Sequence, residues 1–250
     1  MKNNLEFKNK TVLVTGGSKG IGRSICLLFA RLGAKTIFTF RKKDNSVQSL
    51  LNIKFQRKKN VYGYKVSNLN NNPHYLLKEI RKKHKEIHFL INNVGDAIKR
   101  TSFKKSSPKL WKESYITNLQ STVETTRALL KNFNNNKIRT IINIGSVAGK
   151  SGGQGDSLHY GVMKSAIHTF SVGLSKELKN TRVLCVAPNA INTSFQKRLS
   201  SKERIRKIKS NNVLNRLGTA EEVSNLVLFL CSEKASYLNG EVIYLTGGIK

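Results

Sequence analysis

The sequence has few acidic residues, few cysteines, few prolines and no long apolar run. Its 250 residues include 14 Asp and Glu, 3 Cys and 3 Pro. Cys26, Cys185 and Cys231 are far apart and each lies in an apolar segment, which predicts buried thiols in a reducing cytoplasm and excludes a disulfide framework or a metal site built on cysteine. Residues 1–6 lack an apolar core and no run reaches membrane-spanning length, so we expect neither a signal peptide nor a membrane span.

Basic residues, by contrast, are abundant. The 45 Lys and Arg give a formal net charge of +31, a balance that nucleic-acid-binding proteins often show. The basic residues are spread along the whole chain among many asparagines, however, and do not gather in one motif. We therefore expect a solvated basic surface that favours an acidic protein partner, and not a nucleic-acid site. A Rossmann-fold polyanion-binding protein stays open as the alternative that is not an enzyme.

Short β-branched runs alternate with longer segments of helical periodicity, the pattern of repeated βαβ units. This predicts an α/β protein with a Rossmann-type, doubly wound, seven-stranded parallel sheet and helices on both faces. The expected strands are 11–15, 35–40, 61–65, 88–92, 138–144, 182–187 and 241–245. The expected helices are 20–32, 45–57, 73–85, 108–133, 158–179 and 219–232. No boundary divides residues 1–250, so we expect one domain, with a mobile helical flap at 194–212.

A glycine-rich turn follows the first strand and opens the first helix. Its glycines are Gly16, Gly20 and Gly22, and Ser18, Lys19 and Ile21 lie between them. Residues without a β-carbon allow a tight turn and let a pyrophosphate approach the amides at the helix N-terminus. The turn therefore predicts a dinucleotide site.

The end of the second strand indicates which dinucleotide binds. An acidic side chain at this point accepts hydrogen bonds from the free ribose 2′-hydroxyl of NAD. Residues 39–43 contain no carboxylate, whereas Arg41, together with Lys19 of the glycine turn, can hold a 2′-phosphate. We expect NADP(H).

Three further residues suggest the chemistry. Tyr160 and Lys164 are four residues apart in a predicted helix, so they share one face. A free tyrosine has a pKa of about 10, and a neighbouring ammonium lowers it, which makes the phenol a usable general acid. Ser146 lies at the C-terminal end of the predicted buried strand 138–144, at the edge of the sheet where ligands bind in α/β folds.

Together these residues resemble the short-chain dehydrogenase/reductase family over about residues 8–249. Five signatures occur in the order of the family, namely the turn with Gly16, Gly20 and Gly22, the Asn92-Asn93-Val94-Gly95 segment, Asn118, Ser146, and Tyr160 with Lys164. The resemblance implies hydride transfer between a nicotinamide and a carbonyl carbon. It implies that Tyr160 gives the proton, Ser146 orients the carbonyl oxygen, and Lys164 binds the nicotinamide ribose and lowers the tyrosine pKa.

The same resemblance implies the remaining contacts. Asn118 would hold a water that relays protons, and Asn92 would support the central strand and the cofactor. The further cofactor contacts would be Val66, Val94, Gly95, Pro188, Ile191 and Thr193. Where the family usually has an acidic residue next to Val66, this chain has Lys65 and Asn68, so only the backbone of Val66 is left for the adenine.

The motif spacing and segment 216–222 look most like bacterial 3-oxoacyl-[acyl-carrier-protein] reductases, although sugar, polyol and other small-alcohol dehydrogenases share much of this pattern. A tyrosine-to-lysine spacing of four disfavours the enoyl reductases of the family, whose spacing resembles seven. An acyl carrier protein is acidic, and Lys137, Arg139 and Lys179 would contact it. Helices 108–133 and 158–179 resemble those that pair subunits in this family, so a homotetramer is expected.

Overall fold

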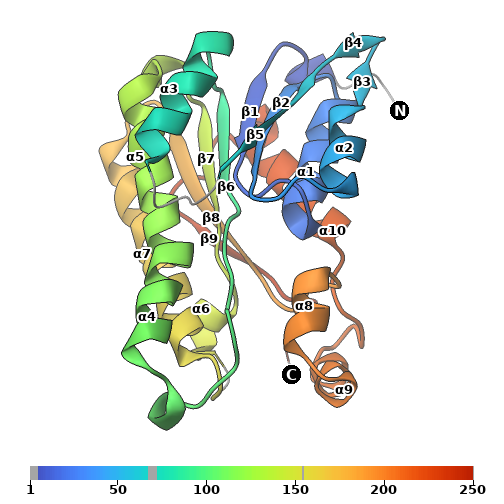
Figure 1. The fold of residues 1–250 in the computed structure, drawn as a ribbon, viewed down its shortest axis with the longest axis vertical. Helices are drawn as coiled ribbons and strands as arrows, with labels where there is room; N and C mark the ends of the chain where they lie inside the picture. The colour runs from blue at the N-terminus through green and yellow to red at the C-terminus, as the bar shows by residue number, and fades with distance from the viewer. Residues whose placement is uncertain (1–4, 67–71, 154, 250) are drawn as a thin grey trace.

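The computed structural model of the chain describes residues 5–66, 72–153 and 155–249. Its centre is a seven-stranded sheet in the order β5-β2-β1-β6-β7-β8-β9, and every neighbouring pair is parallel (Figure 1). The strands are β1 (Thr11–Val14), β2 (Lys35–Phe40), β5 (Val61–Lys65), β6 (Phe89–Asn92), β7 (Thr140–Ile144), β8 (Arg182–Pro188) and β9 (Val242–Leu245). The strand order reverses between β1 and β6, where open α/β sheets bind their ligands.

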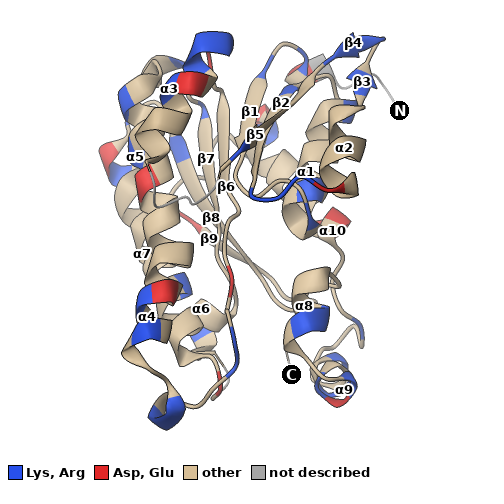
Figure 2. Ribbon diagram, in the orientation of Figure 1, with Lys and Arg blue, Asp and Glu red and all other residues tan. Residues whose placement is uncertain are grey.

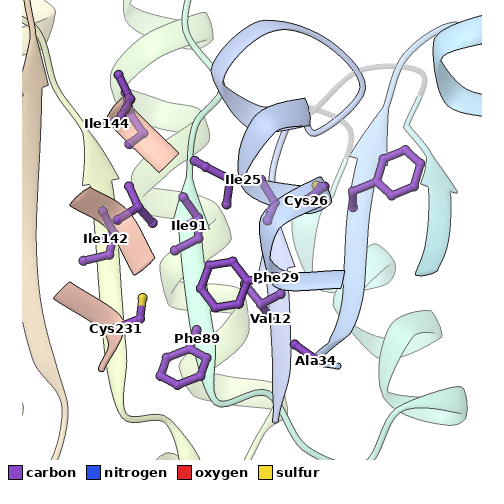
Figure 3. Packing of buried hydrophobic residues seen from close by; sticks show 14 of the residues in the cluster. Val12, Ile25, Cys26, Phe29, Ala34, Phe89, Ile91, Ile142, Ile144 and Cys231 are labelled. Atoms are coloured by element: carbon purple, nitrogen blue, oxygen red, sulfur yellow. The ribbon is translucent and has the colours of Figure 1, made fainter. Parts of the chain in front are cut away.

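Helices cover both faces of the sheet, which confirms the predicted doubly wound fold. One layer consists of α1 (Gly20–Arg31), α2 (Asn45–Leu51) and α10 (Ala220–Cys231), and the other of α3 (Pro73–Lys83), α5 (Ser121–Asn132) and α7 (Leu158–Glu177). The first layer buries the side chains of Ile25 and Phe29 against those of Val12, Phe89 and Ile142 (Figure 3). Apolar residues on successive strands meet helices on both sides, because a parallel sheet is buried on both faces.

The predicted strands agree closely with the structure, and β2 and β5 have the predicted bounds. Helix 108–133 is continuous but not uniform: it consists of α4 (Pro108–Ser114), a π-helical turn η4 (Tyr115–Gln120) and α5. Short 3₁₀ turns lie at η1 (Leu5–Phe7), η3 (Phe103–Lys105), η5 (Asn135–Lys137) and η6 (Glu233–Ala235).

The predicted helix 45–57 is wrong beyond Leu51. After it, β3 (Lys54–Phe55) and β4 (Lys58–Lys59) form a small antiparallel hairpin, whose turn residues Gln56 and Arg57 have φ angles of 49° and 63°. A tertiary contact explains the change, because the Phe55 ring fills the space that a Gly33 side chain would need, 2.8 Å from the position of its β-carbon. Local periodicity carries no information about this contact.

Beyond the carboxyl ends of the strands lie α6 (Ala148–Ser151), α8 (Ser194–Leu199) and α9 (Lys202–Ser210) (Figure 1). The last two occupy the segment predicted as a helical flap, and both are helical as expected. In the part of the chain that the structure describes, no helix is long and apolar enough to cross a membrane.

Candidate active site

A cavity of about 1110 Å³ opens at the carboxyl edge of the sheet, between the glycine turn, the ends of β2, β6, β7 and β8, the start of α7 and the flap. Fifteen of the predicted site residues line it: Gly16, Ser18, Lys19, Gly20, Ile21, Arg41, Val66, Val94, Gly95, Ser146, Tyr160, Lys164, Pro188, Ile191 and Thr193. The predicted residues Gly22, Asn92 and Asn118 are not among the residues that line it.

The glycine turn is packed too tightly for side chains. Gly16 and Gly20 have φ angles of 62° and 53°, a region that residues with a β-carbon rarely adopt. A β-carbon on Gly22 would lie 2.5 Å from Asn93 Nδ2 and 2.6 Å from the Gly16 carbonyl oxygen. The Asn93 amide in turn donates to the carbonyls of Thr15 (3.0 Å) and Gly16 (3.2 Å). Asn93 is thus a supporting residue that the sequence prediction quoted in a motif but did not place in the site.

The N-terminus of α1 is left open toward the cavity. Its N-cap residue, Lys19, is extended and makes no capping hydrogen bond with its side chain, so the first-turn amides keep their donors for a ligand. Gly20 and Ile21 of this turn line the cavity. Open amides at a helix N-terminus without β-carbons nearby suit a pyrophosphate, so the residues present fit a dinucleotide.

A carboxylate that the sequence prediction overlooked lies next to this turn. Asp44 follows the end of β2 by four residues, lines the cavity, and pairs with Lys19 at 2.7 Å. It is the N-cap of α2 and accepts hydrogen bonds from the amides of Ser46 and Val47. Its hydrogen bond with Lys19, and then those with Ser46 and Val47, hold the pKa of the Asp44 carboxyl well below its usual range. Among the described residues, no carboxylate pairs with Arg41.

The backbone of Val66 has only one hydrogen-bonding group free for an adenine. Its amide donates to the Phe40 carbonyl at 2.8 Å, which extends the pairing of β2 and β5, so only its carbonyl is left. Asn68, which was noted above for its lack of acidic character, lies outside the described residues.

Tyr160 and Ser146 meet in the cavity wall. Burial disfavours the phenolate and raises the pKa of Tyr160 to about 12. A hydrogen bond with Ser146 lowers this pKa, the negative charge of Asp96 raises it further, and the positive charge of Arg100 lowers it. The net shift is thus upward and not the lowering expected from Lys164, which is not among the groups that shift this pKa. A phenol with such a pKa is protonated at neutral pH.

Lys164 is almost completely buried, with 2% of its surface exposed. Its ammonium donates to the Ile144 carbonyl at 2.7 Å and lies 5.6 Å from the centre of the Tyr160 ring. Burial lowers the pKa of Lys164 to about 8. Gly95 makes room for it, because a β-carbon there would lie 2.8 Å from the ammonium nitrogen.

Asn118 and Asn92 make hydrogen bonds that stabilise the loop and strands around the cavity. Asn118 lies in the π-helical turn η4 and is fully buried; its Oδ1 accepts from the Asp96 amide (3.0 Å) and its Nδ2 donates to the carbonyls of Asp96 and Ser114, each at 2.9 Å. Asn92 Nδ2 donates to Asn143 Oδ1 at 2.8 Å, which ties β6 to β7. Both side chains therefore fix the loop and strands around the cavity.

Residues after β8 form another part of the cavity wall. Ile191 pairs with Gly218 in an isolated parallel bridge, and Thr193 is the N-cap of α8. Thr193 faces the glycine turn, since its Cγ2 lies 3.5 Å from where a Gly20 β-carbon would be. The entry to the flap is thus anchored beside the proposed pyrophosphate position.

Two carboxylates that the sequence prediction missed form ion pairs with arginines of α8 and α9 and so connect the flap to the loops after β6 and before α7. Asp96, after β6, accepts from Arg198 of α8 at 2.7 and 2.8 Å. Asp156, before α7, accepts from Arg100 at 2.8 Å and from Arg204 of α9 at 2.8 Å. Lys and Arg are otherwise distributed over both helical layers and on α8 and α9 (Figure 2).

The expected carrier-protein contacts Lys137, Arg139 and Lys179 are not at the cavity. Lys137 and Arg139 precede β7 at the amino edge of the sheet, where they pair with Glu86 (3.5 Å) and Glu233 (2.5 Å). Helices between parallel strands run back from the carboxyl edge, so residues at their C-terminal ends, including Lys179 after α7, return to the opposite edge.

Comparison with known proteins agrees with this geometry. A family model described as enoyl-(acyl carrier protein) reductase matches residues 16–250. The chain is 32% identical to the 3-oxoacyl-[acyl-carrier-protein] reductase of Buchnera aphidicola subsp. Schizaphis graminum over 98% of this chain and 99% of that protein. The chain belongs to the short-chain dehydrogenase/reductase family. It is accordingly an oxidoreductase.

Other members of the family are also similar over their whole length. The 3-oxoacyl-[acyl-carrier-protein] reductase of Aquifex aeolicus is 35% identical, with 98% of this chain and 99% of that protein covered. A crystal structure of a short-chain dehydrogenase/reductase (glucose/ribitol dehydrogenase) from Brucella melitensis superposes with a TM-score of 0.87 at 27% identity and covers 98% of each chain. These family members are named for different substrates, so membership of the family does not by itself identify the substrate of this chain.

Proposed function

We propose that this protein reduces a ketone to a secondary alcohol with NADPH, and that its substrate is a 3-oxoacyl group on an acyl carrier protein. The observation that carries the proposal is the meeting of Ser146, Tyr160 and Lys164 in one wall of the cavity, with the Lys164 ammonium 5.6 Å from the centre of the Tyr160 ring. A protonated phenol suits a proton donor to a carbonyl oxygen. The names of the relatives from Buchnera and Aquifex support the same substrate class.

The residues around the glycine turn would hold the cofactor. The amides of Gly20 and Ile21 would bind its pyrophosphate, and Arg41 would bind the 2′-phosphate, because this guanidinium has no carboxylate partner among the described residues. Asp44 does not oppose this preference, since Lys19 and two backbone amides already engage its carboxylate. When bound, the nicotinamide supplies the hydride that reaches the carbonyl carbon.

The side chains of the wall position the carbonyl and deliver the proton. Ser146 donates its hydroxyl hydrogen bond to the carbonyl oxygen and so fixes that oxygen beside the Tyr160 hydroxyl. Tyr160 gives its proton to the oxygen. Lys164, whose pKa of about 8 lies close to neutrality, stabilises the phenolate that forms and returns a proton to it. Asn118 keeps the loop after β6 in place around the ammonium.

The flap side of the cavity favours an acyl substrate over a sugar or polyol. Apolar side chains of Phe195, Leu199 and Ile208 line it, and the Phe195 ring lies 6.4 Å from that of Tyr160. An alkyl chain gains free energy on burial against such side chains, whereas a polyol would leave hydroxyls without partners. The four-residue spacing of Tyr160 and Lys164 favours ketone over enoyl reduction, although the matching family model carries the enoyl name.

Exposed apolar side chains on two parts of the surface bear on how the protein assembles. Tyr115, Leu158 and Val162 expose 45%, 36% and 42% of their surfaces on η4 and α7, and Phe229 and Tyr244 are exposed on α10 and the edge strand β9. Two separate apolar faces support a homotetramer with two kinds of two-fold interface. We also infer that the chain is a single cytoplasmic domain and that α8 and α9 move as a flap over bound substrate.

A turnover assay tests the proposal. Purified protein is mixed with NADPH and acetoacetyl thioesters of coenzyme A or acyl carrier protein, and NADPH oxidation is followed by absorbance. We expect turnover that prefers NADPH to NADH. Absence of turnover on these thioesters, together with oxidation of polyols by NADP⁺, would move the protein to the polyol dehydrogenases; salt-sensitive nucleic-acid binding without turnover of any ketone or alcohol would favour a polyanion-binding role.

A further inference from the structure

His168 lies one helical turn beyond Lys164 on α7, on the same face as Lys164 and Tyr160. The imidazole is 8% exposed, and neither the sequence motifs nor the roles proposed above use it. The three side chains follow one another along one face of the helix, next to the end of β7. Tyr160 and Lys164 reach the cavity, while His168 lies directly behind the strand end that carries Ser146.

The backbone amide of Ser146 has no strand to pair with. On either side of it, the amides of Gly145 and Val147 donate to β8, at 2.7 and 3.0 Å from the carbonyl oxygens of Val186 and Pro188. The intervening Ser146 amide points the other way, as alternate amides of a strand do, toward the position where β6 has already ended. A buried amide without an acceptor is costly, so this one needs a partner.

His168 supplies that partner. The Ser146 amide donates to His168 Nε2 at 3.4 Å. Because a backbone amide can only donate, Nε2 must be the unprotonated nitrogen of a neutral ring. One turn earlier, the Lys164 ammonium donates to the Ile144 carbonyl at 2.7 Å. Helix α7 thus holds the end of β7 by the two backbone groups on either side of Gly145.

The loop is shaped around this ring. A β-carbon on Gly145 would lie 2.6 Å from His168 Nε2, and one on Gly149 would lie 2.6 Å from His168 Cε1. Side chains at these two positions would push the imidazole away from the Ser146 amide. On its other side the ring makes an edge-on contact with Tyr244 of β9, with 5.8 Å between ring centres and an interplanar angle of 87°. The position of the imidazole is therefore defined from three directions.

We propose that His168 is a positioning residue for the reduction, which holds the Ser146 hydroxyl at its place beside Tyr160 through the Ser146 backbone amide. The inference rests on the proposed function, because it assigns to His168 a role in orienting the carbonyl through Ser146. Neutral His168 accepts the amide hydrogen and fixes the backbone, whereas protonated His168 has no acceptor and releases it. Misplacement of a reacting group by a fraction of an ångström slows a reaction even where binding is unchanged.

The surroundings of His168 make this contact depend on pH. The groups that face it are Lys164 on its own helix, the Ser146 amide at the end of β7, Cys185 of β8 and Tyr244 of β9, and Lys150 of α6 lies over the Tyr244 ring. No carboxylate is among them. Burial, and then the charge of Lys164, lower the pKa of His168 below its ordinary value. The neutral, accepting form therefore prevails at neutral pH, and kcat should fall as pH drops through this lowered pKa.

Paired substitutions test the role. His168→Leu removes the acceptor, and we expect kcat for an acetoacetyl thioester to fall about tenfold, with KM for NADPH within about twofold of wild type. His168→Gln places an amide oxygen near the position of Nε2 and should recover most of this loss. His88→Leu is the matched control, because His88 also accepts a backbone amide, that of Thr11 at 3.0 Å, but at the opposite edge of the sheet; this variant should keep the wild-type kcat.

The pH profile gives the decisive comparison. We expect the kcat of the wild-type protein to fall at acidic pH. The kcat of His168→Gln should not show this acid limb, because an amide does not titrate in this range. An unchanged acid limb in His168→Gln, or a kcat of His168→Leu equal to that of wild type, would overturn the proposal. If His168→Leu does not fold, the His168→Gln profile decides alone. Failure of the proposed function is distinct, since the wild-type protein would then turn over no 3-oxoacyl thioester at all.

Discussion

Replacing Gly22 with alanine tests whether the glycine turn is built for a dinucleotide. The added methyl would lie 2.5 Å from Asn93 Nδ2, 2.6 Å from the Gly16 carbonyl oxygen and 3.1 Å from the Gly17 α-carbon. Two of these neighbours are backbone atoms of the turn, and the third is the amide that donates to Thr15 and Gly16. None of them is the free end of a flexible side chain, so the turn itself must move.

The size of the effect follows from these distances. Inserting a methyl group into a well-packed site costs about 1–3 kcal/mol of unfolding free energy. A shift of the turn also displaces the Gly20 and Ile21 amides from the pyrophosphate. Loss of one such hydrogen bond to a charged group is worth about 1.5–3 kcal/mol, so NADPH affinity should fall at least about tenfold.

Fluorescence titration with NADPH and urea unfolding measure the two effects separately. The matched control is Gly173→Ala, because Gly173 lies within α7 and its added β-carbon would have no described atom within 4 Å apart from its chain neighbours and the nearby backbone of its own helix. Alanine there should stabilise the helix by about 0.5–1 kcal/mol and leave NADPH affinity unchanged. Wild-type NADPH affinity in Gly22→Ala would refute the assignment of this turn to the cofactor.

Three further predictions concern the charged groups. Arg41→Ala should raise KM for NADPH about tenfold and leave KM for NADH nearly unchanged in the same assay, because only the 2′-phosphate is lost as a partner; equal effects on both would contradict the NADP preference. Asp156→Asn weakens the contacts with Arg100 and Arg204 that hold the flap, so KM for the thioester should rise about fivefold at constant NADPH KM. Burial lowers the pKa of Lys164 to about 8, so between that pH and about 10.5 the unfolded chain binds more protons. Wild-type stability relative to Lys164→Met should therefore rise over this window in urea titrations, and a constant difference would show that Lys164 is not desolvated.

The interior strands of this fold were predictable because they are short apolar runs buried in a parallel sheet. The bounds of β2 match for this reason, whereas β5 is a partly exposed edge strand whose predicted bounds also match. Helix 45–57 failed beyond Leu51, where the packing of Phe55 on Gly33 decides the conformation and no local signal records it. The π-helical turn around Asn118 likewise depends on tertiary hydrogen bonds, to Asp96, and not on helical periodicity.

The residues of the cavity were predictable where a motif fixes their order, and less so where charge or burial matters. Lys137 and Arg139 were placed near the entrance from their charge alone, yet the direction of the chain carries them to the amino edge. The sequence prediction did not include Asp44, which follows the end of β2 by four residues, although an aspartate before a helix is a recognisable N-cap. The raised pKa of Tyr160 depends on burial, which spacing does not report.

The measurement that tests the central claim most directly is the fate of deuterium from NADPH labelled at the transferable position of the nicotinamide. With an acetoacetyl thioester as substrate, mass spectrometry should find one deuterium at carbon 3 of a 3-hydroxyacyl product. Tyr160→Phe, which keeps the ring but removes the proton donor, should lower the rate at least about a hundredfold without preventing NADPH binding. A deuterated saturated acyl product from a crotonyl thioester but no alcohol from the ketone, or full activity in Tyr160→Phe, would contradict the account.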